Sequence, residues 1–239
     1  MSRTKTVRIL TLSDKIEPVL YGPGLRRIVG DVDLVLSCGD LPDYYLDYVI
    51  STLNVPCCFV HGNHAQGAEF RAHPGIDDEA DGGRLRCVPL DCNVNGRAVR
   101  EKGLLIAGFD GSVRYNRNPR FQYTESQMQR KILRMAPRLL WNRLRYGRYL
   151  DILITHAPPK GIHDGPDACH LGFEAFLRFM RWFRPSYLIH GHKHVYRSDE
   201  VTRTVYHQTE VINTYGYRIL EVTPRHHSLG GPDRERILA

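Results

Sequence analysis

The stretch "LTLSDKIEP", residues 10–18, places an aspartate directly after an apolar run. The run at 7–12 has the length and composition of a short buried strand. An aspartate that follows such a strand, here Asp14, is well placed to bind a ligand at the edge of a sheet. Histidine would be a natural partner in a metal site, yet the chain has Ile16 two residues later, and isoleucine binds no metal. The rest of the chain decides whether Asp14 belongs to a working site.

Further apolar runs predict more short buried strands, each bounded by turn residues. They lie at 33–37, 55–60, 104–108, 151–155 and 186–190. Helix-like stretches at 23–29 and 42–53 separate the early strands, and each begins with a proline, which a first helical turn tolerates. Alternation of strand and helix predicts an α/β fold in which parallel strands are covered by helices.

The middle of the chain predicts edge strands and a basic helical insertion. Residues 81–103 are rich in Gly, Arg and Asp, and the strand signals at 86–90 and 98–100 indicate hairpins or edge strands. Residues 124–147 form a basic helical region, in which Thr124 and Gln127 have the spacing of a capping box. Pro137 is expected to divide this region into two helices.

The last third of the chain predicts one more helix and a set of antiparallel strands. Residues 171–183 carry a helical stripe of Phe and Leu side chains that we assign to the core. Residues 202–222 alternate as antiparallel strands, and residues 224–239 are expected to be a flexible tail. We therefore expect a single domain over residues 1–239.

Composition indicates a soluble globular protein of ordinary kind. The 239 residues are 42% hydrophobic and 25% charged, and no apolar run reaches the roughly 18 to 20 residues that span a bilayer. The N-terminus lacks the features of a signal peptide, so we expect a cytoplasmic protein without a membrane partner. The net charge of +7 favours anionic ligands in general.

Three cysteines lie in or beside apolar runs and are expected to pack in the core: Cys38, Cys57 and Cys58. We expect no disulfides and no structural zinc.

A polar side chain follows each of five predicted strands. In chain order these side chains are Asp14, Asp40, Asn63 with His64, His156, and His192 with His194. The carboxyl ends of parallel strands meet at one edge of a sheet, where ligand sites form. A lone aspartate there is most often a turn former or a helix cap. Five strand ends of this kind together favour a metal site over five separate turns.

The residue types indicate which metals would bind. Carboxylate, amide and imidazole ligands suit Mn²⁺, Fe or Zn²⁺, with Mg²⁺ as a further candidate. The ligands are too many for one ion, and one carboxylate could bridge two. Two ions roughly 3.5 to 4 Å apart clamp a phosphate and generate a hydroxide nucleophile.

At these residues the chain resembles the calcineurin-like metallophosphoesterase superfamily. Its pattern reads D-x-H, G-D-x-x-D, G-N-H-[D/E], a strand-end His, and G-H-x-H. The matching stretches are Asp14, "GDLPD" (39–43), "GNHA" (62–65), "THAPP" (155–159) and "GHKH" (191–194). The resemblance runs from about residue 7 to 222 and implies a four-layer α-β-β-α sandwich with a two-metal phosphoesterase site.

The resemblance also implies a role for each matching residue. Asp40 would bridge the two ions. Asp14 and His194 would belong to the first metal, whereas the second metal would take the ligands Asn63, His156 and His192. His64 would be the histidine that is not a ligand but contacts the phosphate and protonates the leaving oxygen.

The sequence departs from this pattern at two positions. Ile16 replaces the histidine of D-x-H, so we expect a weaker first metal site. Three side chains of the following loop are candidates for the missing ligand: His163, Asp164 and His170. The alternative for them is a hydrogen-bonded loop. Ala65 replaces the acid that would orient His64, which leaves Asp43 as a candidate, or His64 as a neutral hydrogen-bond donor.

A loop and the basic region are candidates for substrate contacts. In "GFDGSVRYN" (108–116), Arg114 could fork onto a phosphate, Tyr115 could stack on a base, and Asn116 completes the polar set. The alternative is a solvated loop. The basic region could form a lid or contact a polyanion, or be a solvated helix face.

We therefore expect a metal-dependent phosphodiesterase that hydrolyses a small nucleotide-type substrate through metal-bound hydroxide. His64 and Arg114 would stabilise the charge that develops on the phosphate. Replacement of Ile16 by His should tighten metal binding at the first site if position 16 faces that site.

The first alternative function is a weak or inactive binding scaffold, because the superfamily includes a retromer-type subunit with a degenerate site. The second is a nuclease, although no nucleic-acid motif is present. The sequence does not indicate an oligomeric state.

Overall fold

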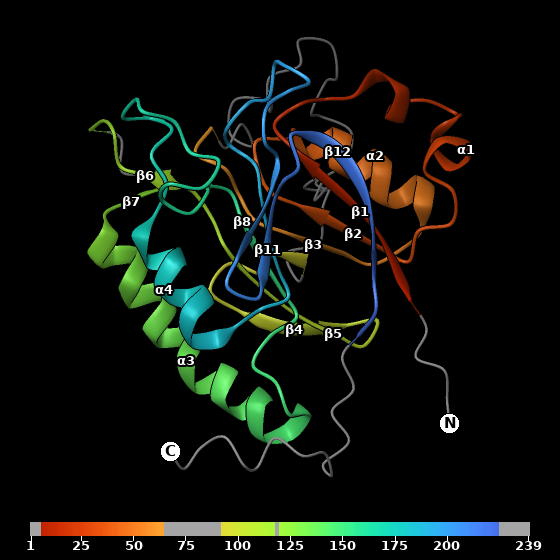
Figure 1. The fold of residues 1–239 in the computed structure, drawn as a ribbon. Coiled ribbons are helices and arrows are strands. Elements are labelled where there is room, and N and C mark those ends of the chain that lie inside the picture. The colour runs from red at the N-terminus through yellow and green to blue at the C-terminus, as the bar shows by residue number, and fades with distance from the viewer. Residues whose placement is uncertain (1–5, 65–91, 118–119, 225–239) are drawn as a thin grey trace, which may run out of the picture.

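The computed structural model describes residues 6–64, 92–117 and 120–224, and Figure 1 shows their arrangement. In chain order the elements are β1 (Val7–Ser13), the 3-10 helix η1 (Pro18–Leu20), α1 (Leu25–Val29), β2 (Leu34–Ser37), α2 (Asp43–Leu53), β3 (Cys57–Phe59), β4 (Ala98–Glu101), β5 (Leu104–Phe109), β6 (Ser112–Val113), β7 (Gln122–Tyr123), α3 (Glu125–Tyr146), β8 (Ile152–Thr155), α4 (Glu174–Phe183), β9 (Tyr187–His190), β10 (Arg203–Tyr206), β11 (Thr209–Asn213) and β12 (Gly216–Val222).

The strands form two main sheets. One has four strands in the order β12-β1-β2-β3, and the other has six in the order β10-β11-β9-β8-β5-β4. The strands that follow one another through helices pair in parallel, as β1 with β2 and β8 with β9. β4, β10 and β12 are antiparallel to their neighbours and lie at sheet edges. The small pair β6-β7 stands apart.

Three apolar cores separate four layers. The inner faces of the two sheets meet in a core that includes Leu36, Ile106 and Ile189. Tyr45 of α2 belongs to a second core, under α1 and α2 on the four-stranded sheet, and Phe176 of α4 belongs to a third, under α3 and α4 on the six-stranded sheet. Figure 1 shows these two helix pairs on opposite sides of the molecule. The α-β-β-α sandwich that the resemblance implies is therefore confirmed.

Apolar runs in the central strands have a simple cause in this architecture. A strand that is covered on both faces needs apolar side chains in both directions. In β2, Leu34 and Leu36 face the core between the sheets, whereas Val35 faces the core under α1 and α2. Cys38, Cys57 and Cys58 are buried in these cores, as predicted.

The basic region is one helix, so the prediction that Pro137 divides it is wrong. α3 begins with the predicted capping box, in which Thr124 accepts a hydrogen bond from the backbone of Gln127 and the Gln127 side chain accepts one from the backbone of Thr124. Pro137 removes one backbone hydrogen bond, to the carbonyl of Leu133. Both residues lie on the exposed side of α3. Water can therefore bind that carbonyl, and packing of the opposite face keeps the helix continuous.

Other predicted elements are displaced or only partly described. Pro42 is the N-cap of α2 and not part of its first turn. Pro23 lies immediately before Gly24, the N-cap of α1. The terminal strands are not one antiparallel set, because β12 returns to pair with β1 in the other sheet. The predicted strand at 86–90 and the predicted tail beyond residue 224 lie outside the described residues. Among the residues that the structure describes, no helix is long and apolar enough to cross a bilayer.

Candidate metal centre

The predicted ligands follow strands of both sheets, not of one sheet as the sequence suggested. Asp14, Asp40 and Asn63 come after β1, β2 and β3, so the four-stranded sheet contributes oxygen atoms. His156, His192 and His194 come after β8 and β9, so the six-stranded sheet contributes ring nitrogens. The two sheets are packed face to face, and their carboxyl ends meet at this edge.

His156 is the fully buried centre of the group. Its Nδ1–H donates to the carbonyl oxygen of Cys38 at 2.8 Å. Its Nε2 lies 2.9 Å from Asn63 Oδ1 and 3.2 Å from Asp40 Oδ2. Burial, the largest influence, would lower the pKa of His156, but the neighbouring Asp40 carboxylate outweighs it and raises that pKa to about 9.

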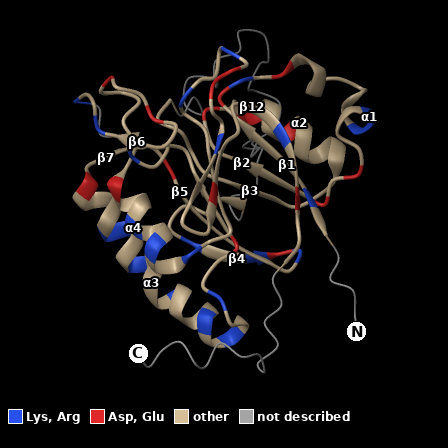
Figure 2. Cartoon of the chain, viewed as in Figure 1, with Lys and Arg blue, Asp and Glu red and all other residues tan. Residues whose placement is uncertain are grey.

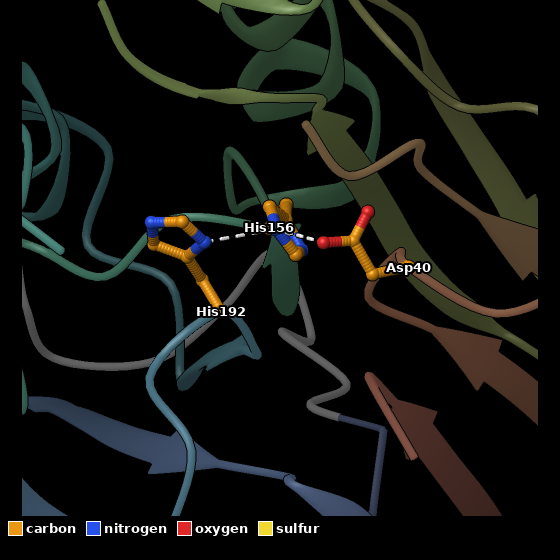
Figure 3. Close-up of side chains that lie close together, drawn as sticks. All are labelled: Asp40, His156 and His192. Carbon is orange, nitrogen blue, oxygen red and sulfur yellow. Dashed lines mark hydrogen bonds and ion pairs between the residues drawn. The ribbon is translucent and has the colours of Figure 1, made fainter. Parts of the chain in front are cut away.

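His192 is held in the complementary orientation. Its Nε2–H donates to the carbonyl oxygen of Cys169 at 2.5 Å, and its Nδ1 lies 3.1 Å from His156 Nε2. Burial and the charge on His156 lower the pKa of His192 to about 3. Figure 3 shows His192, His156 and Asp40 in a row.

Four electron-pair donors therefore converge in one place. They are Asp40 Oδ2, Asn63 Oδ1, His156 Nε2 and His192 Nδ1. Each imidazole uses its other nitrogen to donate to a backbone carbonyl, the arrangement that fixes the tautomer of a metal-ligating histidine. The Asp40 carboxylate in this donor set favours a positive charge there, and it is the cause of the raised pKa of His156. A divalent cation fits the same donor set, with borderline nitrogen and hard oxygen ligands.

Asp40 and Asp14 are fixed by backbone groups. Oδ1 of Asp40 accepts the backbone N–H of His64 at 2.9 Å. Burial would raise the pKa of Asp40, but His156 and this hydrogen bond lower it to about 2. The carboxylate of Asp14 accepts the backbone N–H of His192 at 2.9 and 3.1 Å and the hydroxyl of Ser13. Burial is the largest influence on Asp14 and raises its pKa.

Three of the six strand-end ligand candidates have a left-handed backbone. The φ angles are 62° at Asp14, 53° at Asp40 and 66° at His192. Such a conformation costs about 1–3 kcal/mol at a residue other than glycine and is typical of functional sites. The sharp turn aims each side chain off the end of its strand and back over the sheet edge.

Two motif glycines allow the backbone to touch the carboxylates. A Cβ atom on Gly62 would overlap the carboxylate of Asp40, and a Cβ atom on Gly191 would overlap Ser13 Oγ and the carboxylate of Asp14. These positions therefore require the absence of a side chain. The motif glycines bring the loops after β3 and β9 into direct contact with Asp40 and Asp14.

The half of the centre around His194 is more open. His194 Nε2 lies 3.9 Å from Asp14 Oδ1, and the His194 side chain is 40% exposed. Its Nδ1 is 2.8 Å from the hydroxyl of Tyr196, and its ring lies 4.8 Å from that of Tyr215. Ile16 is half-buried and packs against the core under α1 and α2.

The candidates for the missing ligand have other partners. His163 bonds to His190 at 3.0 Å and to Thr204 Oγ1 at 2.9 Å. Asp164 accepts the backbone N–H of Gly172 at 3.2 Å. These bonds match the hydrogen-bonded loop that was the alternative.

His170 is the candidate that lies nearest the centre. Its ring centroid is 5.3 Å from that of His192, and its Nδ1 bonds to Asp167 at 2.7 Å. Asp167, Cys169 and His170 place their carboxylate, thiol and ring nitrogen close together, at one side of the four converging donors. The same turn carries the Cys169 carbonyl that orients His192.

The predicted substrate-binding residues differ in whether they contact the candidate metal centre. Tyr115 reaches the centre, because its hydroxyl accepts a hydrogen bond from Asn63 Nδ2 at 3.1 Å. The Arg114 guanidinium donates to the carbonyl of Gln122 and to the side chain of Gln127. Asn116 donates its backbone N–H to Gln122 at 3.4 Å. A catalytic role for Arg114 stays a prediction.

The predicted catalytic histidine, His64, is exposed beside Asp40. Ala65 lies outside the described residues. Asp43, the candidate to orient His64, begins α2, and its charge acts on the ring of His61. A role for His64 in protonating the leaving oxygen therefore also stays a prediction.

Sequence reasoning missed the groups that orient the ligands. The carbonyls of Cys38 and Cys169 belong to the backbone, and no side-chain pattern reports them. Tyr196 and Tyr215, which flank His194, are separated in sequence and become neighbours because β11 pairs with β9. A tyrosine two residues after the G-H-x-H motif was the one local signal for them.

Comparisons with known proteins show the family and the fold of the chain. The sequence profile described as calcineurin-like phosphoesterase matches residues 8–196. Among solved structures, TT1561 of Thermus thermophilus is 13% identical, with a TM-score of 0.58 over 92% of this chain and 100% of that chain. A single mutant of Vps29 from Entamoeba histolytica is 13% identical, with a TM-score of 0.41 over 91% of this chain and 87% of the other. No curated protein matches the chain.

Proposed function

Since the chain belongs to the calcineurin-like phosphoesterase family, we propose that it is a metal-dependent hydrolase of a small nucleotide-type phosphodiester. The observation that carries this proposal is the convergence of Asp40 Oδ2, Asn63 Oδ1, His156 Nε2 and His192 Nδ1 on one position. Both imidazoles are oriented by backbone carbonyls, which fixes the ring nitrogens that face the shared position. A phosphoester hydrolase needs such a preorganised cluster.

The proposed centre has two unequal positions. Asp40, Asn63, His156 and His192 would hold the tighter cation. Asp14 and His194 would hold a weaker one, with Asp40 shared between the two. Bound divalent cations would supply Lewis-acid polarisation of the phosphate and acidification of water. Mn²⁺, Fe and Zn²⁺ suit the mixed oxygen and nitrogen ligands, and Mg²⁺ suits the oxygens alone.

The chain's own residues would position the substrate. Tyr115 is bound to Asn63 through its hydroxyl, so its ring borders the centre and offers an apolar face to a base or sugar. This placement is what favours a nucleotide-type substrate. His64 is exposed beside Asp40 and can donate a proton or a hydrogen bond to the leaving oxygen. Arg114 would have to leave Gln122 and Gln127 to reach the phosphate.

A metal-reconstitution assay tests the proposal. Protein that has been stripped of metal and then reloaded with Mn²⁺ or Zn²⁺ should hydrolyse bis-p-nitrophenyl phosphate, and turnover should follow the bound metal. His156→Gln should lose this turnover, whereas His207→Gln, at an exposed histidine between β10 and β11, should retain it. Equal turnover with and without metal, or in the His156 variant, would refute the proposal. Parallel assays with nucleotide monoesters and diesters test the substrate class.

A binding scaffold of weak or no activity is the second candidate. It is favoured by Ile16, whose side chain packs with the core and cannot replace the histidine of the family pattern. Fewer than one metal per chain together with no phosphoester turnover would support the scaffold. About two metals per chain with turnover would support the enzyme. Competition by DNA or RNA oligonucleotides at low salt tests the less favoured nuclease.

A further inference from the structure

Helix α3 carries an exposed apolar stripe that the phosphoesterase centre does not use. Leu133, Leu140, Trp141 and Leu144 are 59%, 52%, 55% and 77% exposed. With Pro137 between them they follow the spacing i, i+4, i+7, i+8 and i+11, so they share one face of the helix. The opposite face carries the side chains that enter the core: Met128, Ile132, Met135, Leu139 and Asn142. The stripe therefore points away from the protein.

The same helix is strongly basic. Its sequence holds five arginines and one lysine against a single acidic residue, Glu125. Arg134, Arg138 and Arg145 lie on the helix between the stripe and the core, and Arg143 lies on its other flank. Within the described ranges, none of the five arginines of α3 forms an ion pair. Figure 2 shows several Lys and Arg positions along α3, which lies at the outer boundary of the molecule.

A hollow adjoins the N-terminal half of the stripe. It has a volume of about 410 Å³ and is lined by Tyr123, Gln127, Arg130, Lys131 and Arg134. Lys131 is paired with Asp110 at 2.5 Å, which leaves Arg130 and Arg134 as the cations that can meet a ligand. Two guanidinium groups beside an aromatic ring are suited to a phosphate group.

We propose that α3 docks the protein on the surface of an anionic phospholipid bilayer, with the leucine and tryptophan stripe in the headgroup layer. The arginines would meet lipid phosphates, and the hollow would accept one headgroup. An apolar stripe with tryptophan, flanked by arginine, is the pattern of helices that lie in a membrane interface. A second copy of the chain is a poorer occupant, because a two-fold contact would place basic flanks against each other.

This mode of binding differs from the one that the sequence excluded. The expectation of no membrane partner came from the absence of an apolar run long enough to span a bilayer. A helix that lies in the interface needs only one apolar face, and α3 uses its other face to bind the rest of the protein. The proposal does not depend on phosphoester hydrolysis, since it concerns a surface outside the metal centre.

Vesicle binding by the full chain tests the proposal. The chain has two tryptophans, so Trp182→Phe leaves Trp141 as the single indole probe. With phosphatidylglycerol-rich vesicles at low salt, the protein should co-sediment, and Trp141 emission should shift to the blue. With pure phosphatidylcholine vesicles neither change should occur. Raising the salt concentration should weaken binding, because the attraction to anionic lipid is screened.

Paired variants identify the surface. Leu140→Glu with Leu144→Glu should weaken vesicle binding about tenfold or more. Arg134→Gln with Arg138→Gln should weaken it about fivefold for each arginine. Val201→Glu, at a side chain that is 69% exposed in a loop, and Arg27→Gln in α1 are the matched controls and should bind as the parent does. All four positions of the paired variants are exposed, so turnover in solution should be unchanged.

Three results would overturn the proposal. One is that the full chain fails to bind anionic vesicles at low salt. Another is that binding survives in the Leu140 and Leu144 variant. The third is a dimer in solution that this variant dissociates without any vesicle binding, which would assign the stripe to a second copy of the chain.

Discussion

The two halves of the candidate centre differ in how firmly the protein holds their side chains. Around His156 and His192, both rings are buried and donate to carbonyl oxygens, and Asp40 accepts a backbone N–H. The His194 side chain is 40% exposed, and its partners are tyrosines. In this half, Ile16 occupies the position where the D-x-H pattern of the family has a histidine. The contrast favours the expectation that a departure from the family pattern weakens metal binding in one half of the centre and leaves the other half intact.

The largest expected effect comes from the residue that the halves share. Asp40→Ala removes the carboxylate next to His156 and, in the proposed centre, the link between both positions. We expect both metal equivalents to be lost, and turnover to fall roughly 100-fold or more, since even a supporting partner contributes about 10–100-fold. Elemental analysis and hydrolysis of bis-p-nitrophenyl phosphate measure the two effects. Retention of one tight metal would show that Asp40 serves a single half.

A matched pair of histidine variants compares the halves directly. His192→Ala should weaken the tighter metal by about 100-fold, because it removes a buried ligand whose orientation is fixed. His194→Ala should weaken only the looser metal, by about tenfold. Calorimetric titration of the stripped protein gives both affinities. If the two variants weaken the same equivalent to the same extent, the halves are not separate.

Ile16→His restores the family residue in the weaker half. We expect the looser metal to bind about tenfold more tightly. The variant should also lose about 1 kcal/mol of stability, because Ile16 packs against an apolar core. Metal titration and thermal denaturation measure these opposite effects. A loss of stability without any gain in affinity would show that the side chain at position 16 stays in the core.

The smallest expected effect concerns the tyrosine next to His194. Tyr196→Phe removes one hydrogen bond to His194 Nδ1. A single bond of this kind contributes about 1 kcal/mol, so the looser metal should bind about fivefold more weakly. The tighter metal should be unaffected in the same titration, and Tyr44→Phe, at an exposed position in α2, serves as the control. Weakening of the tighter metal would contradict the division of the centre into halves.

The sequence predicted much of the fold because buried parallel strands and the polar residues after them are local patterns. The strands before Asp14, Asp40 and His156 were predicted from such patterns. The division of these strands between two sheets was not predicted, because runs of similar apolar side chains do not indicate which strands will share a sheet. Pro137 misled for a related reason: its local effect on α3 is outweighed by packing with the core.

The centre shows the same limit. Residue types and order predicted His156 and His192 as ligands, and the structure brings both rings beside Asp40. The backbone carbonyls that orient these rings depend on where loops distant in sequence come to lie. The three left-handed ligands were likewise not predictable, since Asp and His adopt that conformation only when the surrounding structure requires it.

The supply of oxygen ligands by one sheet and nitrogen ligands by the other has a mechanical consequence. Any cation held between Asp40 and His156 is a cross-link between the two halves of the sandwich. The layers are otherwise joined at this end by apolar contacts and by hydrogen bonds, such as those from His156 to Cys38 and from His192 to Asp14. Loading with metal should therefore slow amide exchange in β2 and β8 together, far beyond the ligands themselves, and chelation should release both sheets at once.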